Sequence, residues 1–368
     1  MALPASAPIA HPADTALLPS QQTTATVAAG PLLTIIVPTY NRAACLEALL
    51  DTLRGELKGL EGQVVVVIGD NASSDRTPEL SASFATQWTD SLVLRHATNL
   101  GADENFCRCV EQVHTPYFWI IGDDDLPRAG TVKALLPMLT QGRPDLVYLS
   151  SRWSQTLSGN DASHPLHTLE GLWLDQASFA RRTHVWTTFI SGCVVRRELA
   201  PNEKLRRFTG SNLVQLGWVL EALKAGRRFL YIATPCVLAT SGNTGGYSVL
   251  KVFGQNFQQV TRDMFQGSAA LQRVASAMIM RTSIAFLPDL IWGHKQAKLG
   301  RFDASESVAH ALEPELGETW VYRLLLRPLD HASPSTSKLL LACAHGLARL
   351  VRVYDRVKAQ TARSLPLS

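Results

Sequence analysis

The sequence lacks several features that would assign it to a common class. Its longest apolar runs, around Leu339–Ala344 and Val64–Ile68, fall far short of the roughly 18 residues that a transmembrane helix needs. It contains no G-x-x-x-x-G-K-[ST] phosphate loop, no G-x-S-x-G nucleophile turn and no H-E-x-x-H pair. We therefore expect no membrane-spanning helix and none of the three enzyme types that these motifs mark.

Cysteine is scarce, and the start of the chain has almost no charge. The six cysteines are scattered, and the one close pair, Cys107 and Cys109, has no second pair or nearby histidine to complete a zinc site. Reduced thiols in a cytoplasmic protein are expected. Residues 1–30 carry Asp14 as their only charged side chain and lack the basic and apolar parts of a signal peptide, which predicts a disordered leader.

The net charge of +4 is concentrated near the end of the chain. Residues 323–363 hold eight basic and two acidic side chains, a net of +6, so the remainder is about −2. That remainder offers no basic stripe for nucleic acid. In a helix over 338–363, one face is apolar and the basic residues lie opposite; the apolar residues are Leu347, Leu350, Val351, Tyr354 and Val357. Such a helix fits an anionic membrane surface or docks on its own domain.

Residues 32–150 alternate strand-like apolar runs with helical patterns. The continuously apolar runs Thr34–Val37 and Val64–Ile68 predict strands of a mostly parallel sheet that helices cover on both faces. Leucines at helical spacing predict a crossover helix over Ala43–Leu57. A second helix is expected to begin with Thr77 as its N-cap, followed by Pro78 and Glu79.

The later part of the chain predicts more strands and then helices only. The pattern weakens over Trp153–His184, where we expect an insertion that faces the acceptor. Further expected elements are a helix over Leu213–Lys224, a strand over Phe229–Ala233, a loop at Ser241–Gly246 and helices beyond about Phe257. The predicted organisation is an α/β domain over residues 31–255, in two halves that meet at 150/151, and a helical region over 256–368.

Polar segments follow four of the predicted strands. They are Pro38–Arg42, Asp70–Asp75, Asn99–Asn105 and Gly122–Asp125. In an open parallel sheet, ligands bind outside the carboxyl ends of the strands, so these segments should converge. The run Asp123, Asp124 and Asp125 needs compensation, because a like-charge pair about 4 Å apart costs roughly 4 kcal/mol at an effective dielectric of 20. A solvated loop would supply it, but after a buried strand Mg²⁺ or Mn²⁺ is favoured.

Together the four segments resemble the family 2 glycosyltransferases, whose nucleotide-binding domain carries P-x-Y-N, D-N-x-S-x-D, N-x-G and D-x-D-type motifs in this order. The resemblance covers about Leu32–Leu149 and continues weakly through Ser191–Arg197 to Pro235. The N-L-G-A-D-E-N-F loop and the T-P-Y-F-W-I-I-G-D-D-D strand are similar to the branch that includes bacterial abequosyltransferases. Those enzymes add a dideoxyhexose during O-antigen assembly.

The resemblance implies a GT-A fold and metal-dependent, inverting transfer of a hexosyl or deoxyhexosyl group. The implied donor is a nucleotide sugar, and the acceptor is a glycan or lipid-linked oligosaccharide of lipopolysaccharide synthesis. The implied location is the cytoplasm, with peripheral attachment to the inner face of the cytoplasmic membrane. The implied cofactor is Mn²⁺ or Mg²⁺.

The resemblance also implies residue roles. Asp124 ligates the metal with Asp125 as the alternative ligand, both counted as catalytic, and Asp123 lies near the ribose or diphosphate and is the third candidate ligand. Gly122 stands where many members have the first aspartate, which blurs these roles. Asp70 accepts a hydrogen bond from the base, and Pro38 and Tyr40 offer a flat surface to it. The remaining expected donor-site residues are Thr39, Asn41, Arg42, Asn71, Asp75 and Gly101.

Some roles stay open at this stage. Arg42 either approaches the phosphates or pairs with Asp70 or Asp75. Asp103, Glu104 and Asn105 either begin a helix or contact the donor sugar.

The general base is also missing, since the family's Glu-Asp pair falls on Val214 and Gln215. Asp175, Glu198 and Glu203 lie in the right half of the chain, but spacing selects none of them.

Two other functions compete with sugar transfer. A nucleotidyltransferase also binds a metal-bound nucleotide on an α/β sheet, but it usually needs a glycine-rich loop after the first strand, and Pro38–Arg42 has no glycine. A catalytically inactive nucleotide- or glycan-binding module would explain the missing base.

Overall fold

The computed structural model describes residues 30–154, 166, 169–241, 247–296 and 307–363 of the chain, with side chains placed as far as Asp355. Apart from Gly30, the predicted leader lies outside these ranges. So does the loop Ser241–Gly246, apart from its first residue.

The first half of the sheet is parallel, as predicted. Its strands are β1 (Leu33–Thr39), β2 (Val64–Asp70), β3 (Ser91–Arg95) and β4 (Tyr117–Ile120). The helices between them are α1 (Ala43–Leu57), α2 (Thr77–Gln87) and α3 (Ala102–Glu111). β1 lies between β2 and β4 and pairs with both in parallel register. These strands are apolar throughout because helices bury both faces of the sheet.

The second half of the sheet is mixed. Its strands are β5 (Leu126–Pro127), β6 (Leu146–Ser154), β7 (Gly171–Leu174), β8 (Cys193–Arg196) and β9 (Phe229–Thr240). The order is β3-β2-β1-β4-β8-β6-β9-β5, with β7 also on β9. β8 runs antiparallel between β4 and β6, and β5 and β7 run antiparallel to β9. β9 extends well beyond Ala233, its predicted end.

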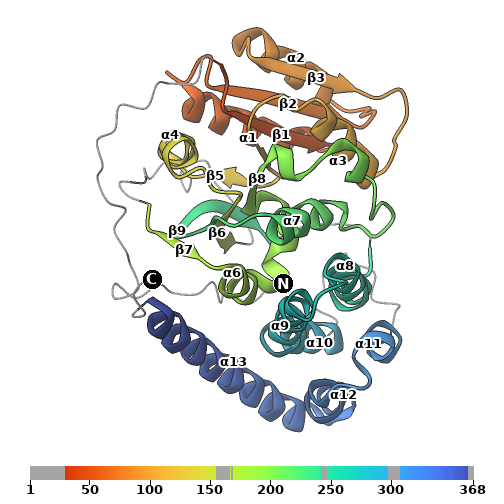
Figure 1. Cartoon of the computed structure of the whole chain (residues 1–368). Coiled ribbons are helices and arrows are strands. Elements are labelled where there is room, and N and C mark those ends of the chain that lie inside the picture. The colour runs from red at the N-terminus through yellow and green to blue at the C-terminus, as the bar shows by residue number, and fades with distance from the viewer. Residues whose placement is uncertain (1–29, 155–165, 167–168, 242–246, 297–306, 364–368) are drawn as a thin grey trace.

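Helices cover both faces of the sheet, and the sheet lies between two hydrophobic cores (Figure 1). On one face, α1, α2 and α4 (Thr131–Pro137) pack on β1, β2 and β4. On the other, α3, α6 (Gln176–Thr183) and α7 (Val214–Ala225) join the C-terminal helices. The region predicted as an acceptor-facing insertion contains β7, α6 and the start of the short helix η3 (His184–Thr188). Part of it lies outside the described residues.

Beyond Phe257 every described element is helical, as the sequence predicted. These elements are α8 (Phe257–Met264), α9 (Ala269–Ala285), α10 (Leu287–Lys295), α11 (Val308–Leu316), η8 (Tyr322–Leu326), α12 (Arg327–His331) and α13 (Pro334–Arg363). Figure 1 shows α13 along the side of the molecule farthest from β2 and β3. Asp355 of α13 accepts ion pairs from Arg181 of α6 and Arg281 of α9, at 3.2 and 2.8 Å. The last helix is thereby tied to the α/β domain through α6 and to the rest of the helical region through α9.

One described helical stretch has the length and composition to cross a membrane. It is Ala269–Lys295, with a mean hydropathy of 1.4 over its most apolar window. Polar and basic residues such as Gln272, Arg273 and Arg281 interrupt it, so it contains no long unbroken apolar run. Since 67% of that window is buried within the protein, its apolar residues pack as those of a core helix do.

Helix α13 both docks on the protein and keeps apolar side chains exposed. Ala344 and Ala348 are buried against the neighbouring helices. Leu350, Val353 and Tyr354 remain 70%, 54% and 61% exposed. The helix therefore docks on its own domain. Its exposed apolar residues are compatible with the other interpretation, contact with an anionic membrane surface.

Helix α2 begins differently from the prediction. Thr77 is its first residue rather than its cap. The carboxylate of Asp75 accepts the backbone N–H of Thr77 at 3.0 Å, so a side chain two residues earlier does the capping.

Glu56 gives a test of how α1 is joined to α4. Its buried carboxylate, at the end of α1, accepts the backbone N–H groups of Gly130 and Val132 at the start of α4, at 2.5 and 2.9 Å. We expect Glu56→Ala to lower the free energy of unfolding by about 1–3 kcal/mol, because two donors lose their acceptor. Urea denaturation measures this, with the exposed Glu61→Ala as control. Equal stability of the two variants would contradict the assignment.

Candidate functional site

The predicted polar segments meet at one edge of the sheet. Thr39 and Asp70 end the parallel strands β1 and β2 and are register partners. Asp123 follows the end of β4, which pairs with β1 on its other side. Parallel strands bring their carboxyl ends to the same edge, so the three segments lie together.

Arg42 joins two of the three aspartates. Its guanidinium contacts Asp123 Oδ1 at 2.9 Å and Asp124 Oδ2 at 2.8 Å. Asp123 also accepts a hydrogen bond from the Thr39 hydroxyl at 2.8 Å. The proposed pairing of Arg42 with Asp70 or Asp75 is therefore wrong, because the nearest acids lie on the loop after β4 instead.

The carboxylate of Asp125 contacts Ser191 and Thr240 and not Arg42. Its Oδ2 accepts the Ser191 hydroxyl at 2.5 Å, and its Oδ1 accepts the Thr240 backbone N–H at 3.3 Å. Ser191 in turn accepts the N–H of Gly122 at 2.8 Å. Asp125 therefore ties the acidic loop to β9 and to the short helix η4 (Ile190–Gly192).

Burial disfavours charge on two of these carboxylates. Burial, opposed by Arg42 and aided by the charge of Asp124, raises the pKa of Asp123 to about 7. Burial and the charge of Asp124 also raise the pKa of Asp125 well above its usual value. A cation close to these groups would favour their ionised forms.

A cation would have oxygen ligands here. Among the described residues, no group of three or more His, Cys, Asp and Glu side chains is arranged to hold a metal ion. Asp123 and Asp124 nevertheless share one positive group, the Arg42 guanidinium, and offer the carboxylate oxygens that Mg²⁺ and Mn²⁺ prefer. The donor set fits a two-carboxylate site, whereas the contacts of Asp125 give no support to its predicted role as a ligand.

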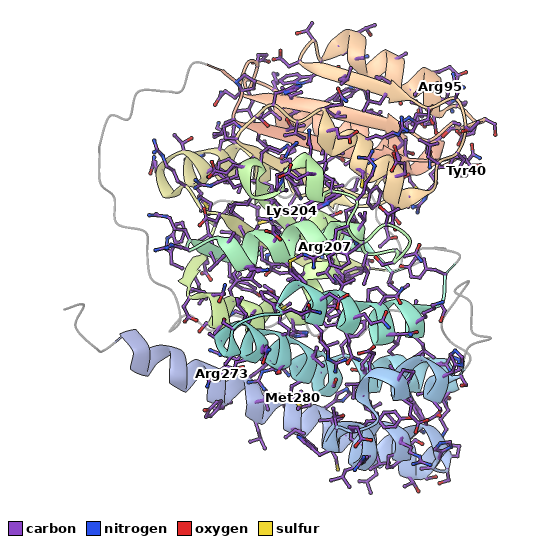
Figure 2. The ribbon with its side chains drawn as sticks, turned by 45° about the vertical axis from the view of Figure 1, so that its right-hand side comes forward. Tyr40, Arg95, Lys204, Arg207, Arg273 and Met280 are labelled. Carbon is purple, nitrogen blue, oxygen red and sulfur yellow. The ribbon has the colours of Figure 1, made fainter. Side chains whose placement is uncertain are left out.

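Asp70 has a buried carboxylate whose two oxygens differ in their contacts. Its side chain is fully buried, and Oδ1 accepts the N–H of Ser73 at 2.9 Å. Among the described residues Oδ2 has no hydrogen-bond partner, and it forms an ion pair with Nε of Arg95 at 3.5 Å. Tyr40 is 42% exposed beyond the end of β1, whereas Pro38 is buried within that strand. Figure 2 labels Tyr40 and Arg95 at this end of the sheet.

Three other predicted donor-site residues connect loops. Asn41 accepts the N–H of Ser74 at 2.7 Å. Asn71 donates to Asn99 at 2.8 Å and to the carbonyl of Gly101 at 3.2 Å. Both Asn41 and Gly101 have positive φ values, 50° and 81°, which asparagine and glycine tolerate best. These contacts hold the first three loops in a fixed arrangement.

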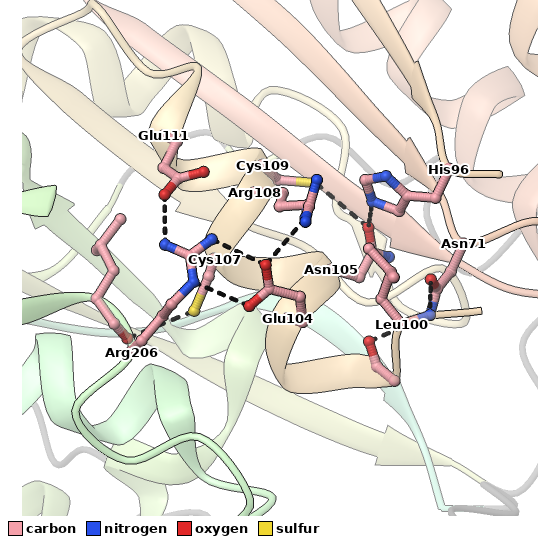
Figure 3. A network of polar contacts seen from close by, with 12 residues as sticks. Asn71, His96, Leu100, Glu104, Asn105, Cys107, Arg108, Cys109, Glu111 and Arg206 are labelled. Atoms are coloured by element: carbon pink, nitrogen blue, oxygen red, sulfur yellow. Dashed lines mark hydrogen bonds and ion pairs between the residues drawn. The ribbon is translucent and has the colours of Figure 1, made fainter. Parts of the chain in front are cut away.

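The third loop is structural (Figure 3). Glu104 pairs with Arg206 and Arg108, each at 2.9 Å, and Asn105 donates to the carbonyl of Gly69 at 2.9 Å. Asp103 accepts the N–H of Gly210 at 2.7 Å. Of the two alternatives for these residues, the contacts favour the helix-start role, since each side chain already has a protein partner.

The candidate bases lie at the wrong edge of the sheet. Glu198 follows Arg196, the partner of Tyr117 at the start of β4. Asp175 follows Leu174, the partner of Phe229 at the start of β9, and it caps α6. Glu203 is close to Arg197, whose backbone N–H donates to the carbonyl of Pro116 just before the start of β4. Strand starts and the acidic loop are at opposite edges, so none of the three is placed to act beside Asp124.

Gln215, at the position of the family's expected acid, is buried. Its amide donates to the carbonyl of Thr188 at 3.1 Å, and its Oε1 has no hydrogen-bond partner among the described residues. A cavity of about 440 Å³ lies elsewhere, between α8, α9 and α11, and none of the predicted site residues lines it.

Residues 34–202 match the sequence profile described as glycosyl transferase family 2. They form a family 2 glycosyltransferase domain. Abequosyltransferase RfbV of Salmonella typhimurium is 32% identical over 122 residues, which are 33% of this chain and 36% of that protein. A PGL/p-HBAD biosynthesis glycosyltransferase of Mycobacterium bovis is 30% identical over 122 residues, 33% of this chain and 46% of that protein. The chain thus aligns with less than half the length of either relative.

Solved glycosyltransferases share the GT-A fold with this chain. TarS residues 1–349 from S. aureus, in complex with UDP-GlcNAc, has a TM-score of 0.55 at 14% identity, covering 92% of this chain and 93% of that one. The mannosyltransferase PcManGT from Pyrobaculum calidifontis, in complex with GDP-Man and Mn²⁺, has a TM-score of 0.50 at 16% identity. It covers 90% of this chain and 85% of its own. At these identities the likeness establishes the fold alone.

The contacts of the acidic loop predict a large loss of stability for one aspartate variant and a small change for its neighbour. We expect Asp125→Ala to lower the free energy of unfolding by about 2–3 kcal/mol, because Ser191 and Thr240 lose a buried acceptor. Asp124→Asn should change it by less than about 1 kcal/mol, since the loss of its contact with Arg42 is offset by relief of like-charge repulsion. Urea denaturation of both variants checks this, and a larger loss for Asp124→Asn would overturn the division of roles.

Proposed function

We propose that this protein transfers a sugar from a nucleotide-diphosphate donor to a glycan or lipid-linked acceptor of the cell envelope. The observation that carries the proposal is the pairing of Asp123 and Asp124 with one cationic group at the carboxyl ends of β1, β2 and β4. The named activities of the sequence relatives support sugar transfer into envelope glycans and glycolipids. The nucleotide and metal ligands of the structural relatives support the donor class.

In this proposal the residues of the first half hold the donor. Asp70 accepts an N–H of the base with Oδ2, and Tyr40 stacks on the ring. Asp123 and Asp124 hold Mg²⁺ or Mn²⁺, which when bound would neutralise charge on the diphosphate leaving group. Arg42 then moves from the aspartates to the phosphates, a role open to a planar guanidinium.

The proposed chemistry is an inverting displacement at the anomeric carbon. The acceptor hydroxyl oxygen bonds to that carbon as the bond to the diphosphate breaks, and the hydroxyl proton passes to a base. Inversion rests on the family resemblance, and anomeric NMR signals of the product would reveal it. Asp175, Glu198 and Glu203 lie at the strand starts, away from Asp124, so none of them supplies the base. This favours one alternative, a binding module without activity.

The donor site can be tested by thermal shift with UDP-, GDP-, CDP- and dTDP-sugars, each with and without Mn²⁺. We expect one nucleotide to raise Tm by a few degrees only with the metal, because a ligand at 100 times its Kd adds about 2.7 kcal/mol. Asp124→Asn should remove both this shift and the transfer of label to an acceptor. A metal-dependent shift without hydrolysis or transfer favours the inactive module, and the absence of any shift counts against a donor site.

We also propose that α13 attaches the protein to an anionic membrane surface, on the inner face of the cytoplasmic membrane. Its exposed apolar residues Leu350, Val353 and Tyr354 lie in a segment that also exposes Arg349 and Arg352. Apolar contact combined with positive charge suits an anionic lipid interface.

Vesicle flotation tests this attachment. We expect the double change Leu350→Asp and Tyr354→Asp to reduce binding to phosphatidylglycerol vesicles at least about tenfold, and salt to weaken wild-type binding. Leu92→Asp is the control, since Leu92 is an exposed apolar residue of β3, distant from α13 in Figure 1. If flotation of the double variant equals that of the control, α13 is not the attachment site.

A further inference from the structure

A small hollow lies beside the acidic loop, in the second half of the sheet. The hollow is lined by Ser150, Ser151, Trp153, Arg182, Trp186 and Tyr231. β6 supplies the first three, α6 and η3 supply Arg182 and Trp186, and β9 supplies Tyr231. It holds about 20 Å³ of free space, room for one water-sized group.

The hollow adjoins the proposed reaction centre through two sets of contacts. Trp153 pairs with Ala239 of β9, and the next residue, Thr240, donates to Asp125. The Trp153 ring also packs on Phe189 with centroids 4.8 Å apart, two residues before Ser191, which donates to Asp125 as well.

An irregularity in the sheet opens this region. β6 and β9 are in register up to Leu149 and Ile232, and pairing resumes at Ser151 and Val237. Ser150 therefore has no partner in the register, and its hydroxyl donates to the Tyr231 hydroxyl at 3.1 Å. Sheet irregularities commonly occur next to active sites, where they redirect side chains.

Arg182 brings a positive charge that has no counter-ion within the described part of the chain. Its guanidinium lies over the Tyr231 ring, 4.5 Å from the centroid. Its Nε is buried without a hydrogen-bond partner, and it forms no ion pair with any residue that the structure describes. A half-buried guanidinium with unused donors is unusual, because buried charges are normally paired.

The surrounding aromatic rings suit a sugar. Trp153 and Trp186 are both partly exposed, with centroids 6.1 Å apart, and Tyr231 stacks on Tyr148 at 5.5 Å. Flat rings next to hydroxyl groups offer apolar contact and hydrogen bonds together. A sugar ring is too large for the hollow itself, so what fits there is a single polar substituent of the ring.

We propose that the hollow is an acceptor subsite for an anionic sugar, in which Arg182 binds a carboxylate or phosphate substituent and Trp153 and Trp186 flank the ring. The chemistry is common to a uronic acid and a sugar phosphate, since a guanidinium binds either anion with paired N–H donors. This inference rests on the proposed function, because it gives the chemical class of the acceptor.

Ligand-observed NMR on the full chain with Mg²⁺ tests the subsite, using D-glucuronate, D-glucose 6-phosphate and D-glucose as probes. We expect at least one anion to bind about tenfold or more tightly than glucose, and the anion preferred identifies the substituent. Arg182→Gln should remove this preference, and Arg182→Lys should keep part of it. Arg273→Gln is the control, on an exposed arginine of α9 that is labelled in Figure 2.

Ser151→Asp provides a second variant, which places a competing carboxylate beside Arg182 and should also abolish anion preference. Equal binding of glucose and both anions, or an unchanged preference in Arg182→Gln and Ser151→Asp, would overturn the inference and leave a hollow filled by water. The nucleotide-dependent thermal shift is measured in the same samples. If that shift is present while anion preference is absent, the subsite alone fails; if the shift is absent in wild type, the proposed function fails.

Discussion

The arrangement of the ligand edge depends on one guanidinium group. Arg42 lies at the end of the first polar segment and holds Asp123 and Asp124, two neighbouring carboxylates that would otherwise repel each other. The residues that position it are themselves held by short contacts: Thr39 fixes Asp123, and Asn41 joins the loop before Arg42 to the loop after β2. Without this positive group, the acidic loop would need a solvent-exposed position or a bound cation.

The three consecutive aspartates consequently have different surroundings. Asp123 and Asp124 share Arg42 at the edge of the sheet, whereas Asp125 faces inward to Ser191 and Thr240. Asp125 thus connects the loop to the second half of the sheet, in which the hollow around Arg182 lies. The donor and acceptor sides of the proposed reaction are joined at this residue.

The first half of the fold could be predicted from sequence because its signals are local. The leucine spacing gave the bounds of α1 as found, and the continuous apolar runs located β1 and β2 within two residues at their ends. The second half was harder. β6 and β9 continue past a register irregularity into polar residues, and their pairing partners are distant in the chain. No local pattern indicated the strand direction either, since β8 is antiparallel only relative to its neighbours β4 and β6.

The predictions for the site likewise succeeded where the signal was local and failed where contacts were distant in the chain. The order of the polar segments was enough to bring Thr39, Asp70 and Asp123 to one edge, as the register confirms. The partner of Arg42 was missed because it lies 82 positions away, beyond the nearer candidates Asp70 and Asp75. Asp175 and Glu198 looked suitable as bases only while the direction of β7 and β8 was unknown. Arg182 carried no motif, and its importance depends on having no ion-pair partner among the residues that the structure describes.

The central claim is that Asp123 and Asp124 form a cation site which Arg42 occupies in the absence of ligand. Anomalous scattering from crystals grown with Mn²⁺ and a nucleoside diphosphate tests it most directly. We expect a manganese peak within coordination distance of the Asp123 or Asp124 carboxylate, with Arg42 turned towards the phosphates. A bound nucleotide with no such peak, and with Arg42 still bridging the two aspartates, would contradict it.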